Sequence, residues 1–164
     1  MPNIVEKVLA KKILDVNAKD KKGLTALSIA LRKNNLEIAL LLKAYKALPI
    51  NILEAVLISD LESVKKFIDS KADLEIRDSS GNTPLILACL NRNYEIASYL
   101  LKNEANVNAR NNAGLSPTLI AAMQNDTEAL SLVLHYNANI LLGDANGLTP
   151  LSYAVFFDNM VGFF

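Results

Sequence analysis

The sequence contains a single cysteine, a single histidine and no tryptophan. Cys89 cannot form an internal disulfide, and its isolation favours a reducing compartment, so we expect a cytoplasmic protein. A catalytic triad would have to use His135, and metal sites built on several imidazoles or thiolates are excluded. We therefore expect no enzymatic activity, no metal and no cofactor.

Long apolar runs and an excess of charge of one sign are also missing. Lys+Arg and Asp+Glu number 17 each, and no run approaches the roughly 18 apolar residues that mark a membrane span. The six glycines occur singly, which excludes a phosphate-binding loop. A composition of 51% hydrophobic residues is too apolar for disorder. These totals predict a folded protein without a membrane span, and they disfavour nucleic acid as a partner.

The chain has an internal repeat of constant length. A repeat of this kind must be recognised first, because it decides the whole fold. An alanine marks each copy at the same interval, namely at Ala55, Ala88, Ala121 and Ala154, and Ala30 precedes this series at a shorter interval. A glycine stands at a fixed offset before the alanine, at Gly23, Gly81, Gly114 and Gly147. Another alanine follows it at a fixed offset, at Ala47, Ala72, Ala105 and Ala138.

Each repeated position has a physical use. Glycine supplies the positive φ of a turn tip, and Thr83-Pro84, Ser116-Pro117 and Thr149-Pro150 are typical helix starts, with an N-cap hydroxyl followed by proline at the first helical position. The small alanine lets helices approach closely. Apolar residues three and four apart in Tyr94–Leu101 predict a second, amphipathic helix.

The stretch Asp78–Ala88, continued by Leu100-Leu101 and Ala105–Ala109, resembles the ankyrin repeat, a hairpin turn followed by two antiparallel helices. The resemblance covers essentially the whole chain. It implies an all-α fold, an ankyrin-repeat α-solenoid with β-hairpin-like turns between helix pairs. It also implies a protein whose role is to bind another protein.

We expect one domain over residues 1–164, divided into a series of units. Residues 4 to 17 are expected to form the second helix of a half unit, and Pro49 is expected to open the helix of a shortened copy. The units are an N-terminal half repeat (1–19), a repeat (20–49), a repeat lacking the hairpin (50–77), two full repeats (78–110 and 111–143) and an incomplete terminal repeat (144–164).

The sequence departs from the family pattern at several positions. Where the family has histidine after Thr-Pro-Leu, this chain has Ser28, Ile86, Leu119 and Ser152. The glycine between the two helices is replaced by Asn34, Ser59, Arg92, Asn125 and Asp158, and the one ending the second helix by Lys71, Glu104 and Asn137. Asparagine tolerates the left-handed conformation that glycine favours, whereas lysine and glutamate adopt it at a cost of about 1 kcal/mol each, so we expect a modestly stable array.

The resemblance implies a partner-binding groove lined by hairpin tips and first helices. One row of groove residues stands two residues after the repeating alanine and consists of Arg32, Leu57, Leu90, Met123 and Phe156. A second row, on the tips, is Leu24, Asn82, Leu115 and Leu148. Neighbouring candidates are Lys21, Lys22, Lys33, Asn91, Asn112 and Gln124. Exposed apolar rows usually indicate a binding site; alternatively, these side chains pack against the next unit.

Charge is unevenly distributed along these rows. Lys19, Lys21, Lys22, Arg32 and Lys33 cluster in one repeat, and the apolar row ends at Phe156. We predict a partner segment that is acidic at one end and apolar at the other. The cluster could equally be a solvated capping face.

Three isolated features have plain structural interpretations. Cys89 directly follows the packed Ala88, so we expect a buried core residue and not a nucleophile. His135 should lie on the surface near the end of a second helix. Asn125-Asp126-Thr127 matches the glycosylation triplet but is expected to be a turn between helices.

The leading hypothesis is a non-catalytic protein-interaction scaffold. One alternative is the recognition arm of a longer enzyme or effector, and another is a nucleic-acid or anionic-lipid contact through the basic repeat. The last repeat breaks off at Phe163-Phe164. An array end normally has a polar outer face, so we expect either that the native chain continues or that this end associates with a second copy.

Overall fold

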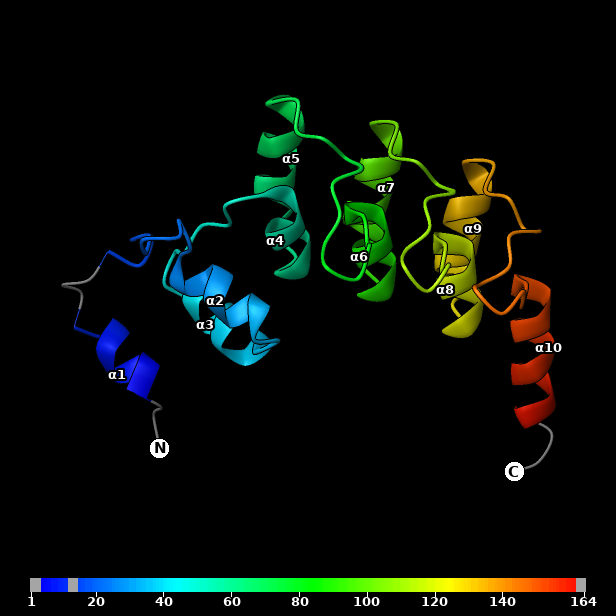
Figure 1. Cartoon of the computed structure of the whole chain (residues 1–164), viewed down its shortest axis with the longest axis horizontal. Helices are drawn as coiled ribbons and strands as arrows, with labels where there is room; N and C mark the ends of the chain where they lie inside the picture. Colours follow the sequence, from blue (N-terminus) through cyan, green and yellow to red (C-terminus); the bar gives the residue numbers. More distant parts are fainter. Residues whose placement is uncertain (1–3, 12–14, 162–164) are drawn as a thin grey trace. The chain divides into compact units, whose positions relative to one another are not determined.

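The structure, a computed structural model, describes the backbone of residues 4–11 and 15–161 and the side chains as far as Phe156 (Figure 1). It contains two compact units, Met1–Phe67 and Ile68–Phe164. Within the described ranges the regular structure is entirely helical, which confirms the all-α class. Phe163 and Phe164, which prompted the expectation about the end of the array, lie outside the described residues.

The first unit is held by a small aliphatic core. Its helices are α1 (Ile4–Leu9), α2 (Ala26–Arg32), α3 (Leu36–Ala44), α4 (Ile52–Leu57) and the greater part of α5 (Leu61–Asp69). Helix α1 ends well before residue 17, although residues 12–14 of the expected helix lie outside the described part. One cluster of buried residues comprises Leu27, Ala30, Ala39, Leu42, Ala47 and Ile58.

Helix α4 does not open at Pro49, and that expectation was wrong. Pro49 is buried in the connection, and the helix begins at Ile52 after the N-cap residue Asn51. Asn51 Oδ1 accepts a hydrogen bond from the Glu54 backbone N–H at 2.9 Å, and Glu54 Oε2 accepts one from the Ile50 N–H at 3.0 Å. Two of the amides at the helix start are thereby satisfied by side chains, and no proline is needed there.

The second unit is built from two helix pairs and a longer last helix. The helices are α6 (Pro84–Leu90), α7 (Tyr94–Lys102), α8 (Pro117–Met123), α9 (Thr127–His135) and α10 (Pro150–Val161). Helix α6 packs against α8, α7 against α9 and α8 against α10, so equivalent helices lie side by side (Figure 1). All three predicted proline starts are confirmed.

Local sequence explains these helix starts. The Thr83 and Ser116 hydroxyl oxygens each accept a backbone N–H from three residues ahead at 3.3 Å. The second helix of each pair is capped by Asn93 or Asp126 in the same way, at 3.1 and 3.0 Å. The marker alanine Ala121 is completely buried, as expected for a position where helices approach closely.

The tips are hairpin-like turns organised by one carboxylate or amide. The Asp78 N–H donates to the Asn82 carbonyl at 3.1 Å, and Asp78 Oδ1 accepts the N–H groups of Ser80 and Asn82. Gly81 has a φ of +78°, and a Cβ there would collide with the backbone of Asn112 in the next tip. The glycine is therefore required twice, by its conformation and by the close approach of the next turn.

Successive tips are joined through their backbones. Asn112 N–H donates to the Ser80 carbonyl at 3.0 Å, and Ala145 N–H donates to the Ala113 carbonyl at 3.1 Å. The same bond thus recurs at the next pair of tips. It fixes the spacing between neighbouring repeats of the second unit.

The residues that replace the glycines of the family pattern adopt the left-handed conformation in seven cases. Positive φ values occur at Asn34, Ser59, Arg92 and Asn125, and at Lys71, Glu104 and Asn137. Asp158 is different, because α10 runs on to Val161. The expected turn between helices at Asp158 is therefore not formed.

Both serines that replace the family histidine hydrogen-bond the threonine three residues earlier. The oxygen–oxygen distance is 3.1 Å for Thr25 and Ser28, and 3.1 Å for Thr149 and Ser152. The apolar replacements Ile86 and Leu119 are fully buried instead. At the position of the family histidine, this chain therefore has either a serine that bonds the N-cap threonine or an apolar core residue.

Candidate functional site

The first predicted row runs along the ends of the first helices in the second unit. Leu90 closes α6, Met123 closes α8, and Phe156 lies on α10 at the same register. The exposed fraction is 38% for Leu90 and 61% for Phe156, and Met123 is half-buried. The alternative, that these side chains are buried against the next repeat, therefore does not hold for Leu90 or Phe156.

The two predicted rows meet at a small pocket. Leu148 of the tip row and Phe156 of the helix row line it together with Ser152 and Tyr153, around a volume of about 240 Å³. Leu148 is exposed, and Leu115, its equivalent one repeat earlier, is half-buried. Here the geometry joins both rows in a single apolar recess.

A polar contact holds one wall of this pocket. The Tyr153 hydroxyl donates to Asp144 Oδ2 at 2.9 Å, and Asp144 Oδ1 accepts the N–H groups of Asn146 and Leu148. The hydrogen bond to Asp144 raises the pKa of Tyr153. Burial pushes the pKa of Asp144 upward, but the hydrogen bonds from Leu148, Tyr153 and Asn146 outweigh it, so the pKa of Asp144 is lowered. The ionised Asp144 thus anchors both the turn and the tyrosine ring.

Asn82 does not belong to the exposed row. Its side chain is buried, Asn82 Nδ2 donates to Asp78 Oδ2 at 2.9 Å, and Asn82 Oδ1 accepts from Asn111 Nδ2 at 2.9 Å. A leucine at the equivalent position, such as Leu115, cannot make these bonds. We correct the sequence-based assignment of Asn82 from the partner surface to the joint between two tips.

Two of the remaining polar candidates of the second unit, Asn112 and Gln124, also join repeats. Asn112 is exposed, and its Nδ2 donates to the Ser79 carbonyl at 3.2 Å. Gln124 Nε2 donates to the Leu90 carbonyl at 3.0 Å, and the Gln124 carbonyl accepts from Arg92 Nη2 at 2.7 Å. Asn91 is the exposed C-cap of α6. The ends of α6 and α8 are therefore fixed relative to each other beneath the apolar row.

The first unit holds the basic candidates. Lys21 and Lys22 are exposed on a turn in which Asp20 Oδ1 accepts the Lys22 N–H at 2.8 Å. Arg32 ends α2 and Lys33 is its C-cap, and both are exposed. The two aliphatic candidates of this unit, Leu24 and Leu57, are half-buried.

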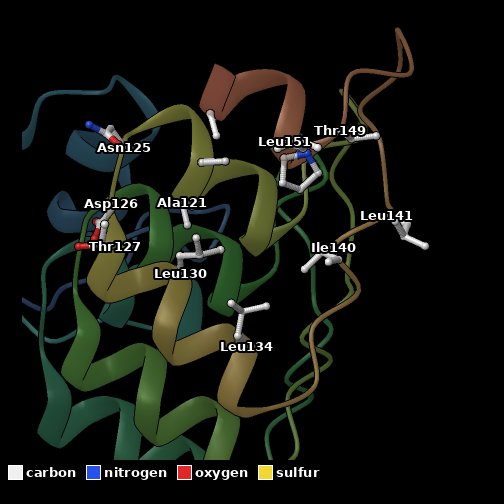
Figure 2. A pocket seen from close by; sticks show the side chains of 13 residues that line it. Ala121, Asn125, Asp126, Thr127, Leu130, Leu134, Ile140, Leu141, Thr149 and Leu151 are labelled. Carbon is white, nitrogen blue, oxygen red and sulfur yellow. The ribbon is translucent and has the colours of Figure 1, made fainter. Parts of the chain in front are cut away.

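Sequence reasoning missed a larger pocket in the second unit. It has a volume of about 390 Å³ and lies between α9, α10 and the turn that connects them (Figure 2). Its main apolar walls are Leu130, Leu134, Ile140, Leu141 and Leu151. A signal was present, because the polar Asn108 of one repeat becomes Leu141 in the next.

Sequence reasoning also missed a pair of arginines. Arg77 Nη1 donates to the carbonyl of Gly81 at 2.9 Å and to that of Arg110 at 2.6 Å. Arg110 donates to Gly114 at 3.1 Å and to Gly143 at 2.7 Å. The signal in the sequence was that the two arginines are separated by one full repeat length. Both side chains stabilise turns and bridge to the following repeat.

The isolated reactive residues lie where the sequence predicted. Cys89 is buried, and burial together with the nearby Asp126 carboxylate raises the pKa of its thiol to about 12. His135 is exposed at the end of α9, and Asn125 forms the turn before it. Across the part of the chain that is described, no group of three acidic, histidine or cysteine side chains could hold a metal ion. In that same part, the helices are too short or too polar to cross a bilayer.

Comparison with known proteins agrees with this architecture. The family model described as ankyrin repeats in three copies matches residues 52–144, which is more than half of the chain. A search of curated proteins found no match. Ankyrin repeats are generally modules of protein–protein interaction, and domains built from them are typically non-catalytic. With its regularly repeated helix pairs, hairpin-like tips and matching family model, this chain belongs to the ankyrin repeat family.

Proposed function

We propose that this chain is a non-catalytic scaffold that binds a partner protein through the apolar row of its second unit. The row, called here the groove row, consists of Leu90, Leu115, Met123, Leu148 and Phe156. The observation that supports it best is the recess between Leu148 and Phe156, where two exposed apolar residues flank a cavity of about 240 Å³. Folded proteins seldom leave such side chains together at the surface without a ligand.

The chemistry of the recess suggests what it would accept. Its walls are the side chains of Leu148, Tyr153 and Phe156, with Ser152 as the polar member. One large apolar side chain of the partner would gain most by entering it, since burial of a leucine or phenylalanine contributes about 2 kcal/mol. Leu90 and Met123 would then contact flanking apolar residues of the same partner segment.

The groove row is held in place before any partner arrives. Gln124 Nε2 fixes the end of α6 through the Leu90 carbonyl, and Asp144 fixes Tyr153. A preformed surface loses little conformational entropy on binding, which favours affinity. The bonds made by Gln124 and Asn112 give these two residues a supporting role. Asn91 and Asn112 are exposed and can add polar contacts.

The basic residues of the first unit suggest a second property of the partner. Lys21, Lys22, Arg32 and Lys33 are exposed, and they would favour a partner with an acidic segment, mainly by speeding association at low salt. A cytoplasmic location fits this proposal, since the lone thiol of Cys89 needs no oxidising compartment.

The test compares capture of partners by the wild type with capture by variants. Leu148→Asp/Phe156→Asp places charge in the recess, and Leu40→Asp places it on the similarly exposed Leu40 of α3, outside the groove row. The proposal is supported if wild type and Leu40→Asp both retain a partner that the double variant loses. The melting temperature of the double variant should be unchanged. Equal retention by all three proteins would refute it.

Leu90→Asp/Met123→Asp separates binding from packing. If these residues serve recognition, the double variant loses the captured partner while its melting temperature falls by only a few degrees, about 4 °C or less. A much larger drop in melting temperature would show that the two side chains mainly pack against neighbouring helices.

A further inference from the structure

The outer face of α3 in the first unit is apolar along its whole length. Leu36, Leu40 and Ala44 stand four residues apart on this helix, so they lie in one line along its surface. Leu36 is 50% exposed, Leu40 is 47% exposed, and Ala44 is exposed as well. The inner side of α3 places Ala39 and Leu42 in the buried cluster of the same unit. We call Leu36, Leu40 and Ala44 the α3 line.

The second helices of the three following repeats, α5, α7 and α9, do not have such a line. Each has nine residues and begins directly after a capping side chain, as α3 does, so their positions correspond one to one. At the positions of Leu40 and Ala44 they have polar or charged residues, namely Lys65 and Asp69, Ser98 and Lys102, and Ser131 and His135. All of these side chains are exposed or half-buried. The exposure of the α3 line thus belongs to its register and does not depend on where the array ends.

The apolar character of this register indicates that α3 has a partner on its outer side. A helix that is apolar on its inner and outer sides alike is typical of one that is covered on both. Single exposed leucines are ordinary at a protein surface. Two leucines and an alanine in line, where the equivalent helices have polar residues, form a surface suited to being covered.

The shape of the α3 line favours a helix as its occupant. Side chains four apart form the ridge that a second helix accepts between its own side chains, and this is the commonest way in which two helices pack. A strand could not pair here, because the main-chain groups of α3 bond within the helix and those of an extended segment would lose their partners in water. A helix keeps its own main-chain bonds when it docks.

The charges beside the α3 line are basic. Lys33 stands just before the helix and Lys46 just after it, and both are exposed. Lys43 on the helix itself is engaged elsewhere, since its Nζ donates to the Ile58 carbonyl at 2.8 Å and to the Ser59 carbonyl at 3.0 Å. Two free ammonium groups therefore flank the ends of the apolar line.

Acidic residues are nearly missing from this part of the chain. Between residues 21 and 53 there is only Glu37. A glutamate stands at the same place in the following second helices, at Glu62, Glu95 and Glu128, where it suits the positive start of a helix. Glu37 thus belongs to the general repeat pattern, and the charges particular to this repeat are positive. They favour an occupant with acidic residues beside its apolar ones.

A lipid surface fits the α3 line less well than a protein helix. A helix that lies in a membrane surface offers its whole apolar side to the acyl chains. Ala39 and Leu42 of α3 are instead buried within the first unit, so only the narrow line remains to be covered.

We propose that the α3 line is a second docking site, and that its occupant is an amphipathic helix of a partner protein with acidic residues on both sides of its apolar stripe. The α3 line shares no residue with the groove row. This site therefore stands or falls independently of the function proposed for that row.

Selection from a displayed library of helical peptides on the full chain tests this proposal. Peptides that also bind Leu36→Asp/Leu40→Asp are removed, and we expect those that remain to have apolar residues three or four apart, flanked by Asp or Glu. In fluorescence anisotropy, Leu40→Asp should weaken binding of a selected peptide at least about tenfold. Leu40→Ser, which introduces the residue found in register in α7 and α9, should weaken it as well. Lys33→Glu/Lys46→Glu should weaken it chiefly at low salt.

Matched controls separate the α3 line from the fold and from the groove row. Ser131→Asp changes the same register of α9 and should bind the peptide like wild type. The Leu148→Asp/Phe156→Asp variant should also bind it like wild type, whereas a partner of the groove row is retained by Leu40→Asp. Circular dichroism should show an unchanged melting temperature for Leu40→Ser, because serine already occupies this register in two helices.

Three results would overturn the proposal. The first is a library that yields no peptide whose binding depends on Leu36 and Leu40. The second is a set of dependent peptides with basic instead of acidic flanks. The third is binding to phosphatidylserine vesicles by wild type but not by Leu40→Asp, which would assign the α3 line to a lipid surface.

Discussion

Arg77 donates through Nη1 to the main-chain carbonyl of Arg110, at 2.6 Å, across the full length of one repeat. The same nitrogen also donates to the Gly81 carbonyl in its own turn. Arg110 then makes the equivalent pair of bonds to Gly114 and Gly143. A planar guanidinium can clamp one turn and bridge to the next because its several N–H groups have a fixed geometry.

Replacing Arg110 by lysine should therefore destabilise the second unit even though the charge is kept. An ammonium cannot reproduce the fork that reaches both the Gly114 and the Gly143 carbonyls. We expect the free energy of unfolding in urea to fall by about 1 kcal/mol, a modest value because the side chain is exposed. Lys102→Arg, at another exposed position, should change it by less than about 0.5 kcal/mol. Equal effects of the two substitutions would contradict the bridging role.

The repeated elements of the second unit were predictable because each depends on a short-range signal. Thr83-Pro84 specifies a helix start locally, and Gly81 specifies a turn tip, so their recurrence at a constant interval predicts both the elements and their order. The buried marker alanines followed from the same register. The family match at residues 52–144 agrees with this prediction.

Features that depend on the contacts of a residue with other parts of the fold were not predictable from short-range signals. Asn82 occupies a groove register, but the amide of Asn111 in the next tip draws it into a buried hydrogen bond. Pro49 resembled a helix start, but Asn51 and Glu54 form a better cap just after it. The pocket between α9, α10 and the turn that connects them was missed because the pattern predicts which side chains point inward, and not whether another layer covers them.

Glu104 offers a test of the backbone strain predicted from the missing glycines. Its φ is +69°, a conformation that costs a non-glycine residue about 1 kcal/mol. Glu104→Gly should raise the free energy of unfolding by about 0.5 kcal/mol, less than the full strain because glycine also gains freedom in the unfolded chain. Lys102→Gly, at the last residue of α7, should lower it by about 0.5 kcal/mol. Destabilisation by both substitutions would show that Glu104 is not strained.

Asp126 joins two repeats through one carboxylate. Its Oδ1 caps α9, and its Oδ2 accepts the Tyr94 hydroxyl at 2.8 Å and lies 3.7 Å from Arg92 Nη1. Tyr94→Phe should lower the free energy of unfolding by about 1 kcal/mol, and Asp126→Ala by about 2 kcal/mol or more because the cap is lost as well. The double variant should cost less than the sum of the two single changes. Strict additivity in urea unfolding would show that the Tyr94–Asp126 bond contributes nothing.

The buried thiol of Cys89 predicts how stability changes in alkaline solution. Its pKa rises from 9.0 to about 12 in the folded protein, first because of burial and then because of the Asp126 carboxylate. Above about pH 9 the thiol ionises in the unfolded chain but not in the folded one, so the folded state holds the extra proton. The free energy of unfolding should therefore fall as pH rises from about 9 toward 12.

Comparison with Cys89→Ala isolates this contribution. Tyr94 and Tyr153 also have raised pKa values and weaken the fold in the same direction, but they are present in both proteins. Near neutral pH the variant should be less stable by about 1 kcal/mol, because it loses a buried sulfur atom. This difference should shrink steadily above pH 9 when urea unfolding is followed by circular dichroism. A constant difference would mean that the Cys89 thiol ionises equally in both states, and rapid labelling of native protein by a thiol reagent would point the same way.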